Sequence, residues 1–190
     1  MIRKASQTDI DRIIDLHLNS FSDDHLSVLF SRKMLNEYFS ILIKRNQFSY
    51  VYYNDDGKDL IGYVITGYET KEAVKEFIKK NRYSLMIVLL KNPKFLLEKI
   101  MELLRRNSAK LKNQGTKCRL YLIAIDSTYK GKGVGRKLIS YLEEQLCSMD
   151  ITEYGLSVRN ENIEAVEFYN KLNYSIVSED TRSVSYIKKI

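Results

Sequence analysis

A glycine-rich loop between an apolar strand and an amphipathic helix is the strongest constraint in this sequence. The near-continuous apolar run of residues 119–125 predicts a strand that is buried on both faces. Gly131, Gly133 and Gly135 follow it and lead into a predicted helix at about residues 134–148. Glycine lets the backbone turn tightly, and the first N–H groups of a helix lack internal partners at the positive end of its dipole. Strand, loop and helix together therefore predict a cradle for a phosphate or pyrophosphate group.

The side chains of this loop narrow the choice of ligand without deciding it. Lys130, Lys132, Arg136 and Lys137 add positive charge around the predicted cradle. The Walker order of glycine, lysine and Ser/Thr is absent. A Rossmann fingerprint that began at Gly133 and Gly135 would need its third glycine where Leu138 stands. An ordinary glycine-rich turn remains the alternative interpretation.

The rest of the chain alternates predicted helices and strands without a repeat or a low-complexity linker. Strands are predicted at about residues 2–5, 48–53, 60–68, 154–158, 174–178 and 183–188, and helices at about 9–19, 31–45 and 161–172. We expect Thr8 to cap the first helix and His17 to face the core from it. This pattern predicts a single domain over residues 1–190, of the α/β (α+β) class with a mixed sheet.

The net charge of +7 is concentrated in one segment. Between Lys71 and Lys117 there are thirteen Lys and Arg and four Asp and Glu residues, which gives a local net charge of +9. We describe residues 69–115 as the basic insert; its pattern is mostly helical, with an apolar stripe at 96–104 after Pro93. These Lys and Arg side chains either keep the exposed faces of helices hydrated or form a surface that binds an anion, such as a nucleotide, a phosphorylated substrate or a membrane surface.

Other features exclude several classes of protein. The longest apolar run, residues 85–90, is too short to span a bilayer, and no signal-peptide pattern opens the sequence. Cys118 and Cys147 provide neither a disulfide framework nor a metal-site spacing, and there are only two histidines. We therefore expect a cytoplasmic protein with no membrane span and no metal. Aromatic residues are not interleaved with the cations of the insert, so no nucleic-acid partner is expected.

Two stretches of the chain carry a recognisable order of residues. Residues 123–126 (IAID) and 129–135 (YKGKGVG) follow the pattern R/Q-x-x-G-x-G/A after a strand, and residues 162–174 (NIEAVEFYNKLNY) follow the pattern N-x-x-A-x-x-x-Y-x-K-L-G-F. The first stretch resembles motif A, and the second a further segment, of the GNAT superfamily of acyl-CoA-dependent N-acyltransferases. Lys130 stands where the family usually has Arg or Gln. Asn173 replaces the usual glycine and tolerates the left-handed conformation at a helix end. The resemblance is firm over residues 119–178 and says least about the basic insert.

The resemblance implies acetyl-CoA as the acyl donor substrate and a mixed, mostly antiparallel sheet with helices on both faces and the insert before the fourth strand. The CoA pyrophosphate would lie on the loop amides and the pantetheine arm along the strand edge, where an amide near Ile123 or Ile125 would polarise the thioester carbonyl. Asn162 would bond the arm, and Tyr169 would protonate the leaving thiolate. The implied cofactor-binding residues are Ile123, Ala124, Ile125, Lys130, Gly131, Lys132, Gly133, Val134, Gly135, Arg136, Asn162 and Lys171. For Tyr169, a packed aromatic beside Phe168 is the alternative role.

The resulting hypothesis is an N-acetyltransferase that acts on a primary amine of a small acceptor. The basic insert suggests an anionic acceptor such as an amino sugar, held by Arg105, Arg106, Lys110 and Lys112. A protein or peptide amine acetyltransferase and a non-catalytic acyl-CoA-binding regulatory domain are the alternatives. The insert alternatively serves packing or formation of a homodimer. Candidates for a general base are Glu69 and the cluster Asp23, Asp24 and His25.

Overall fold

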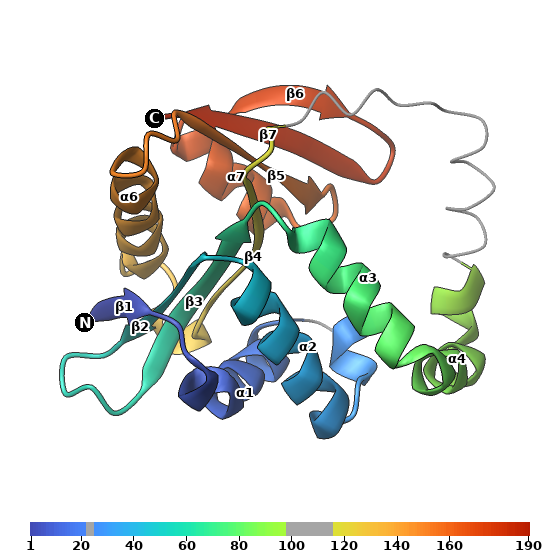
Figure 1. Cartoon of the computed structure of the whole chain (residues 1–190). Helices are drawn as coiled ribbons and strands as arrows, with labels where there is room; N and C mark the ends of the chain where they lie inside the picture. Colours follow the sequence, from blue (N-terminus) through green and yellow to red (C-terminus); the bar gives the residue numbers. More distant parts are fainter. Residues whose placement is uncertain (22–24, 98–115) are drawn as a thin grey trace.

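A seven-stranded sheet with the order β1-β2-β3-β4-β5-β7-β6 forms the centre of the molecule (Figure 1). The computed structural model describes residues 1–21, 25–97 and 116–190. Every neighbouring pair of strands is antiparallel except β4 and β5, which confirms the predicted mixed, mostly antiparallel sheet. The strands are β1 Ile2–Lys4, β2 Phe48–Tyr53, β3 Leu60–Gly67, β4 Arg119–Ile125, β5 Glu153–Arg159, β6 Ser175–Glu179 and β7 Ser183–Lys189.

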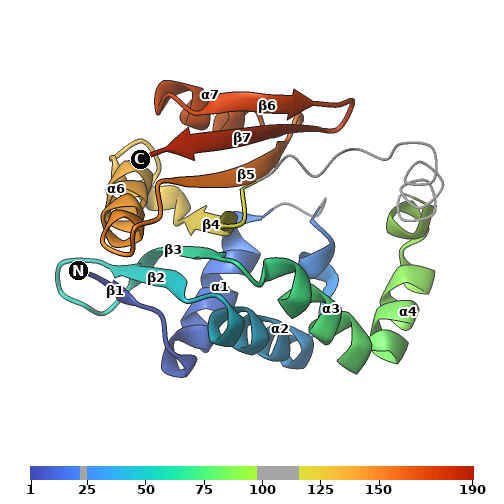
Figure 2. The same ribbon diagram turned by 45° about the horizontal axis from the view of Figure 1, so that its top comes forward.

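Helices cover both faces of the sheet, as predicted (Figure 2). The described helices are α1 Ile10–Ser20, α2 Arg32–Arg45, α3 Thr70–Lys80, α4 Arg82–Lys91, α6 Val134–Cys147 and α7 Ile163–Lys171. One apolar core lies between α1, α2 and one face of β2–β4, and a second lies between α6, α7 and the opposite face. The predicted boundaries of the strands and of α1, α2, α6 and α7 are correct to within one or two residues.

The first part of the predicted basic insert consists of α3 and α4. Helix α3 buries Ala73 and Phe77 in the core that α1 and α2 form, whereas α4 buries only Leu85. Residues 93–97 are helical and begin the predicted apolar helix. The remainder of that prediction, including Arg105, Arg106, Lys110 and Lys112, lies outside the described residues.

The start of α1 is fixed by a buried carboxylate and not by the predicted cap. Asp9 accepts hydrogen bonds from Arg3 at 2.6 and 2.8 Å, from the Tyr53 hydroxyl at 2.7 Å and from the Ser6 amide at 2.8 Å. Burial raises the pKa of Asp9, but these hydrogen bonds outweigh it and hold the pKa well below its usual range. Helix α1 begins directly after Asp9, so the prediction that Thr8 caps it is wrong.

A chain of buried polar side chains connects α1 to the segment before α2. His17 is fully buried, which confirms its predicted place in the core. Its Nδ1 lies 2.8 Å from the Tyr63 hydroxyl and its Nε2 lies 2.7 Å from the Ser27 hydroxyl, which also lies 2.5 Å from Nδ1 of His25. Burial and the neighbouring His25 lower the pKa of His17 to about 3, and burial and Arg159 lower the pKa of His25 to about 4.

These two histidines should make the fold sensitive to mildly acidic pH. Both are neutral in the folded chain at pH 5, whereas in the unfolded chain each takes up a proton below about pH 6.5. The unfolded state then binds more protons, so the free energy of unfolding should fall by about 1 kcal/mol per histidine for each pH unit below 6. Urea unfolding at pH 7, 6 and 5 measures this, and His25→Asn should reduce the slope. If His25→Asn leaves the pH dependence of the free energy of unfolding unchanged, His25 does not contribute to it, which would contradict the prediction.

Candidate functional site

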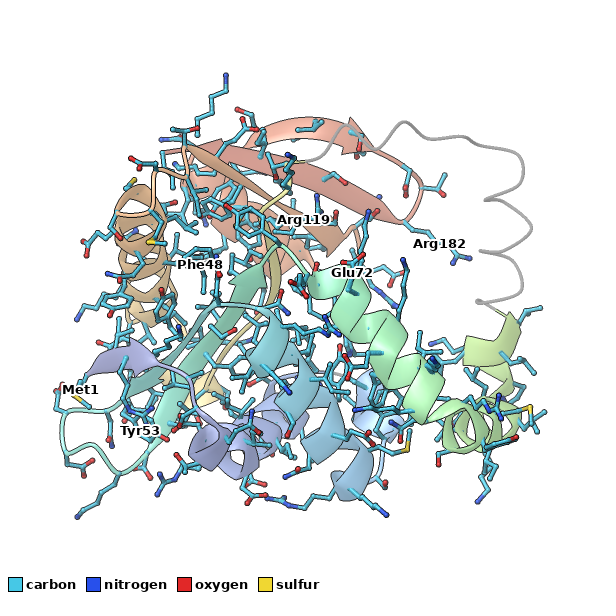
Figure 3. The ribbon with its side chains drawn as sticks, in the orientation of Figure 1. Met1, Phe48, Tyr53, Glu72, Arg119 and Arg182 are labelled. Carbon is cyan, nitrogen blue, oxygen red and sulfur yellow. The ribbon has the colours of Figure 1, made fainter. Side chains whose placement is uncertain are left out.

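Among the described strands, only β4 and β5 pair in parallel, and they meet at one point and then separate. Arg119 and Gly155 are the one registered pair between them, and the Gly155 N–H donates to the Cys118 carbonyl at 3.0 Å. Figure 3 shows Arg119 close to this junction. Beyond it, β5 continues in register with β7 up to Arg159, whereas β4 continues in register with β3. The sheet therefore opens toward the carboxyl ends of β4 and β5.

The backbone of β4 presents polar groups to this opening. In an antiparallel pair, residues alternate between facing the partner strand and facing away from it. The Asp126 N–H donates to the Ile61 carbonyl, so Ala124 also faces β3, while the backbone groups of Ile123 and Ile125 face away from β3 toward β5. The Ile125 carbonyl accepts a long hydrogen bond from the Ser20 hydroxyl at 3.4 Å. The predicted strand edge at residues 123–125 is thus an edge in the structure.

The glycine loop lies directly after this edge and leads into α6. Gly131 and Gly133 have positive φ angles of 74° and 79°, and Gly133 is the N-cap residue of α6. The first backbone bond of the helix is from the Lys137 N–H to the Gly133 carbonyl. In the glycine loop and the first turn of α6, five amides have no backbone acceptor among the described residues, and they belong to Gly131, Gly133, Val134, Gly135 and Arg136. Their number and their place at a helix N-terminus suit an anion.

The third glycine has a different structural reason from the first two. Gly135 lies within α6, and its φ is not positive. A Cβ atom at this position would lie 3.3 Å from the Phe168 ring and 3.7 Å from Cγ1 of Ile125. Gly135 therefore lets α7 pack closely against the start of α6 and the end of β4, which brings the two predicted motifs together.

Three of the predicted cationic side chains already contact neighbouring side chains. Lys130 pairs with Glu164 in the first turn of α7 at 2.8 Å, and Lys171 pairs with Glu167 at 3.1 Å. Nζ of Lys132 lies 5.2 Å from the centre of the Tyr129 ring. Because these groups are largely exposed, their pairings contribute little to stability and can be exchanged for a bound anion.

Helix α7 carries both residues that the second motif singles out. The Asn162 side chain caps the helix by accepting a hydrogen bond from the Ala165 N–H at 3.1 Å. Tyr169 is 3% exposed, and its ring lies 5.0 and 5.9 Å from those of Tyr174 and Tyr186. No hydrogen-bond partner for its hydroxyl exists among the described residues, and burial raises the pKa of that hydroxyl well above its usual value. Tyr169 is thus a packed aromatic whose polar atom the fold itself does not use.

The comparisons with known proteins agree with this geometry. A family model described as the acetyltransferase (GNAT) family matches residues 10–174. The chain belongs to the GNAT acetyltransferase family. Acetyltransferase SG1711 from Sodalis glossinidius (strain morsitans) is 32% identical over 56 residues, which are 30% of this chain and 39% of that protein. The GNAT chain therefore matches less than half the length of this relative.

Solved structures show the same fold over the whole chain. The PaiA N-acetyltransferase from Thermoplasma acidophilum in complex with coenzyme A has a TM-score of 0.63 at 17% identity, with 100% of this chain and 98% of that chain covered. The ribosomal-protein-S18-alanine N-acetyltransferase from Escherichia coli has a TM-score of 0.57 at 16% identity, with 98% and 90% covered. At such identities the likeness shows a shared GNAT fold.

One face of the GNAT sheet beside the opening carries polar side chains that the sequence analysis did not single out. Nη2 of Arg119 donates to the Ser157 hydroxyl at 2.8 Å, and that hydroxyl lies 3.1 Å from the Ser185 hydroxyl. Arg159 lies two residues after Ser157 and therefore on the same face of β5. The Asn160 N–H donates to the Arg182 carbonyl, which places the β6–β7 turn beside the end of β5. The sequence signal was the alternation of polar and apolar residues in β5.

The predicted base candidates divide into three groups. Asp23 and Asp24 lie outside the described residues. Glu69 bonds Arg45 at 2.7 Å and precedes α3, at the end of β3 opposite the glycine loop. His25 lies near Arg159, but its low pKa makes it a weak proton acceptor at neutral pH. Glu69 therefore lacks the position of a general base in this site, and His25 lacks the pKa of one.

The described part of the chain holds no group of three or more His, Cys, Asp or Glu side chains arranged to bind a metal ion. It also contains no helix that is long and apolar enough to cross a membrane.

The positive φ of Gly133 gives a direct test of the amide cradle. Alanine at this φ is strained by about 1–2 kcal/mol, and the added Cβ would meet no atom within 4 Å. We expect Gly133→Ala to turn the amides of the loop and to weaken acetyl-CoA binding about tenfold or more in calorimetric titration. Gly57→Ala is the matched control, because Gly57 also has a positive φ of 73° and open space but lies in the β2–β3 turn. Equal affinities for the two variants would contradict the cradle.

Proposed function

We propose that this chain transfers an acetyl group from acetyl-CoA to a primary amine, with the opening between β4 and β5 as its active site. The observation that carries the proposal is the single registered pair Arg119–Gly155, beyond which the backbone of Ile123 and Ile125 faces the opening. A pantetheine arm is a chain of amides, and it can pair with such an edge as a further strand would. The family membership and the free amides of the glycine loop support the same donor.

In this proposal the donor lies along β4, from the loop toward the junction with β5. The pyrophosphate binds the amides from Gly131 to Arg136, with Lys130 and Lys132 around it. The thioester carbonyl accepts a hydrogen bond from the amide of Ile123 or Ile125, which stabilises the negative charge that develops on its oxygen. Asn162 contacts the arm from the side of α7, and Lys171 lies at the far end of the same helix.

The chemical step exchanges one bond for another at the thioester carbon. The neutral amine forms the N–C bond, the C–S bond breaks, and CoA leaves as a thiolate. Tyr169 donates a hydrogen bond or its proton to that thiolate, and water takes the proton that the new amide loses. Because the raised pKa keeps the Tyr169 hydroxyl protonated, it is always in the donor form at neutral pH.

The acceptor amine has to be neutral when it attacks. An alkylamine with a pKa of about 10.4 is neutral to roughly one part in a thousand at pH 7. Since neither Glu69 nor His25 suits a strong base, an amine of lower pKa, such as that of an amino sugar, needs the least help. We therefore propose a small amine acceptor that enters from the face with Arg119 and Ser157.

The charge on this face favours an anionic acceptor. Arg119, Arg159 and Arg182 come from the start of β4, the end of β5 and the β6–β7 turn, and Figure 3 labels the first and the last of them. A guanidinium group binds phosphate and carboxylate oxygens well. This supports a phosphate- or carboxylate-bearing amine, such as a nucleotide-linked amino sugar, over a polyamine. A peptide amine with acidic neighbours is the second candidate, because a peptide-type acetyltransferase has the same fold.

We also propose a cytoplasmic location. Cys118 is buried and unpaired, and burial raises the pKa of its thiol to about 11. Cys147 is also unpaired. A reducing compartment suits two free thiols.

Tyr169→Phe tests whether the chain is an enzyme or only binds acyl-CoA. The Tyr169 hydroxyl has no partner in the described fold, so we expect the melting temperature to change little. Turnover should fall about 10- to 100-fold while acetyl-CoA affinity persists. Tyr50→Phe is the control, because Tyr50 is also buried but lies on β2. Full turnover in Tyr169→Phe would remove Tyr169 from the mechanism.

A screen of amines by thiol release tests the acceptor class. We expect a nucleotide-linked amino sugar to be acetylated faster than a polyamine. With the best acceptor, Arg182→Gln should raise the acceptor KM about three- to tenfold and leave the acetyl-CoA KM unchanged. Lys33→Gln, an exposed charge change on α2, is the control. Faster turnover of peptides, with no effect of Arg182→Gln, would favour the peptide candidate.

A further inference from the structure

Helix α4 is apolar around its whole circumference but is hardly covered by the rest of the described molecule. Its central residues are Leu85-Met86-Ile87-Val88-Leu89-Leu90, of which only Leu85 is buried. Figures 1 and 2 show α4 at the edge of the molecule, with α3 between it and α2. A helix of this composition normally lies inside a protein or in contact with lipid. The uncovered face of α4 therefore calls for a partner.

The exposed side chains form one continuous stripe. Tyr83, Met86, Ile87 and Leu90 are 64, 54, 54 and 64% exposed, and they follow the spacing i, i+3, i+4, i+7 of one helix face. At 100° per residue, Arg82 and Lys91 lie on opposite flanks of this stripe. Ile78 on α3 and Leu97 after α4 are also exposed, at 49 and 59%. We call the surface that Tyr83, Met86, Ile87 and Leu90 form the α4 stripe.

Within residues 77–97 the charged side chains are all basic, and one of them, Lys80, pairs with Glu76 on the preceding turn of α3 at 3.1 Å. Between Phe77 and Leu97 the chain has five basic residues and no acidic residue. The basic residues are Lys79, Lys80, Arg82, Lys91 and Lys94. Arg82 also lies over the Tyr83 ring, 4.6 Å from its centre, and donates a hydrogen bond to its hydroxyl. An apolar stripe with cations on both flanks matches a surface that is apolar inside and anionic outside.

This charge pattern favours one of two candidate partners for the α4 stripe, a second copy of the chain or an anionic bilayer. A second copy of the chain, packed stripe against stripe, would bring ten cations together without one anion from these segments, and like charges in contact are unfavourable. An anionic bilayer provides hydrocarbon for the stripe and phosphate or carboxylate groups for both flanks. Tyrosine and arginine side chains suit the boundary between the hydrocarbon and the headgroups of the bilayer. At ten residues, α4 is too short to span the bilayer, so it would lie in the plane of the surface.

We propose that the α4 stripe docks this protein on an anionic membrane surface. Met86, Ile87 and Leu90 enter the boundary between headgroups and acyl chains, and Lys79, Arg82 and Lys91 contact the headgroups. Docking of this kind is reversible, because one short helix buries little apolar surface. It gives the basic insert a role separate from catalysis and independent of acetyl-CoA binding.

Flotation of the whole chain with lipid vesicles tests the proposal. The probes are vesicles of phosphatidylcholine alone and vesicles with about 30% phosphatidylserine. We expect binding to the anionic vesicles that weakens at least tenfold when the salt concentration rises from about 0.05 to about 0.5 M. Absence of binding at low salt, or equal binding to both kinds of vesicle, overturns the proposal.

Matched variants show whether a change in vesicle binding comes from the α4 stripe or from any change in surface charge or exposed apolar area. Met86→Glu should weaken vesicle binding more than tenfold, whereas Met149→Glu should not, because Met149 is also largely exposed, at 61%, but lies after α6. Lys79→Gln with Lys91→Gln should weaken binding about 25-fold, at about fivefold for each cation. Lys33→Gln with Lys58→Gln is the charge-matched control, since both lysines are exposed and distant in sequence.

Two further measurements keep the result unambiguous. Acetyl-CoA titration of each variant shows that it is folded, so a loss of lipid binding alone supports the proposal. Sedimentation velocity measures the oligomeric state. A dimer that Met86→Glu converts to a monomer, with no binding to either kind of vesicle, identifies a second copy as the partner and overturns the proposal.

Discussion

The site depends on the way β4 and β5 part after a single registered pair. A parallel pair that ran its full length would close the sheet and satisfy every backbone group of β4. Because the strands separate after Arg119 and Gly155, the backbone of Ile123 and Ile125 faces space instead of a strand. The two halves of the sheet can separate because different helices pack on each of them. Helices α1 and α2 pack on β2–β4, while α7 packs on β5–β7. Helix α6 and the glycine loop then begin next to the opened edge.

Much of this arrangement could be predicted from local sequence. The elements, the mixed sheet and the place of His17 follow from apolar periodicity, and the left-handed turn at Asn173, with a φ of 58°, follows from residue type. The sequence predicts the glycine loop as a whole but does not distinguish its three glycines from one another. The structure separates Gly131 and Gly133, which need positive φ, from Gly135, which needs room beside Phe168. That difference depends on the packing of α7 and cannot be read from spacing.

Features that depend on distant residues were missed. The pair between Lys130 and Glu164 joins residues 34 positions apart, and the bond between Arg119 and Ser157 joins residues 38 apart. Asp9 fixes the start of α1 through Arg3 and Tyr53, so the local pattern pointed to Thr8 instead. The register of β4 against β5, which creates the opening, is a property of the whole sheet. Sequence periodicity predicts that both strands exist but not where they part.

The junction of the two strands also makes the opening a wedge of fixed depth. From Ile125 to Arg119 there are six residue steps, and a strand rises about 3.3 Å per residue, so the wedge is about 20 Å deep. Its apex is held by backbone pairing, and the Arg119 side chain bridges to Ser157 there. With the donor placed along β4 as proposed, an acyl chain that extends toward Arg119 meets this junction. In that proposal the junction sets a limit on length, so short acyl groups fit more readily than long ones.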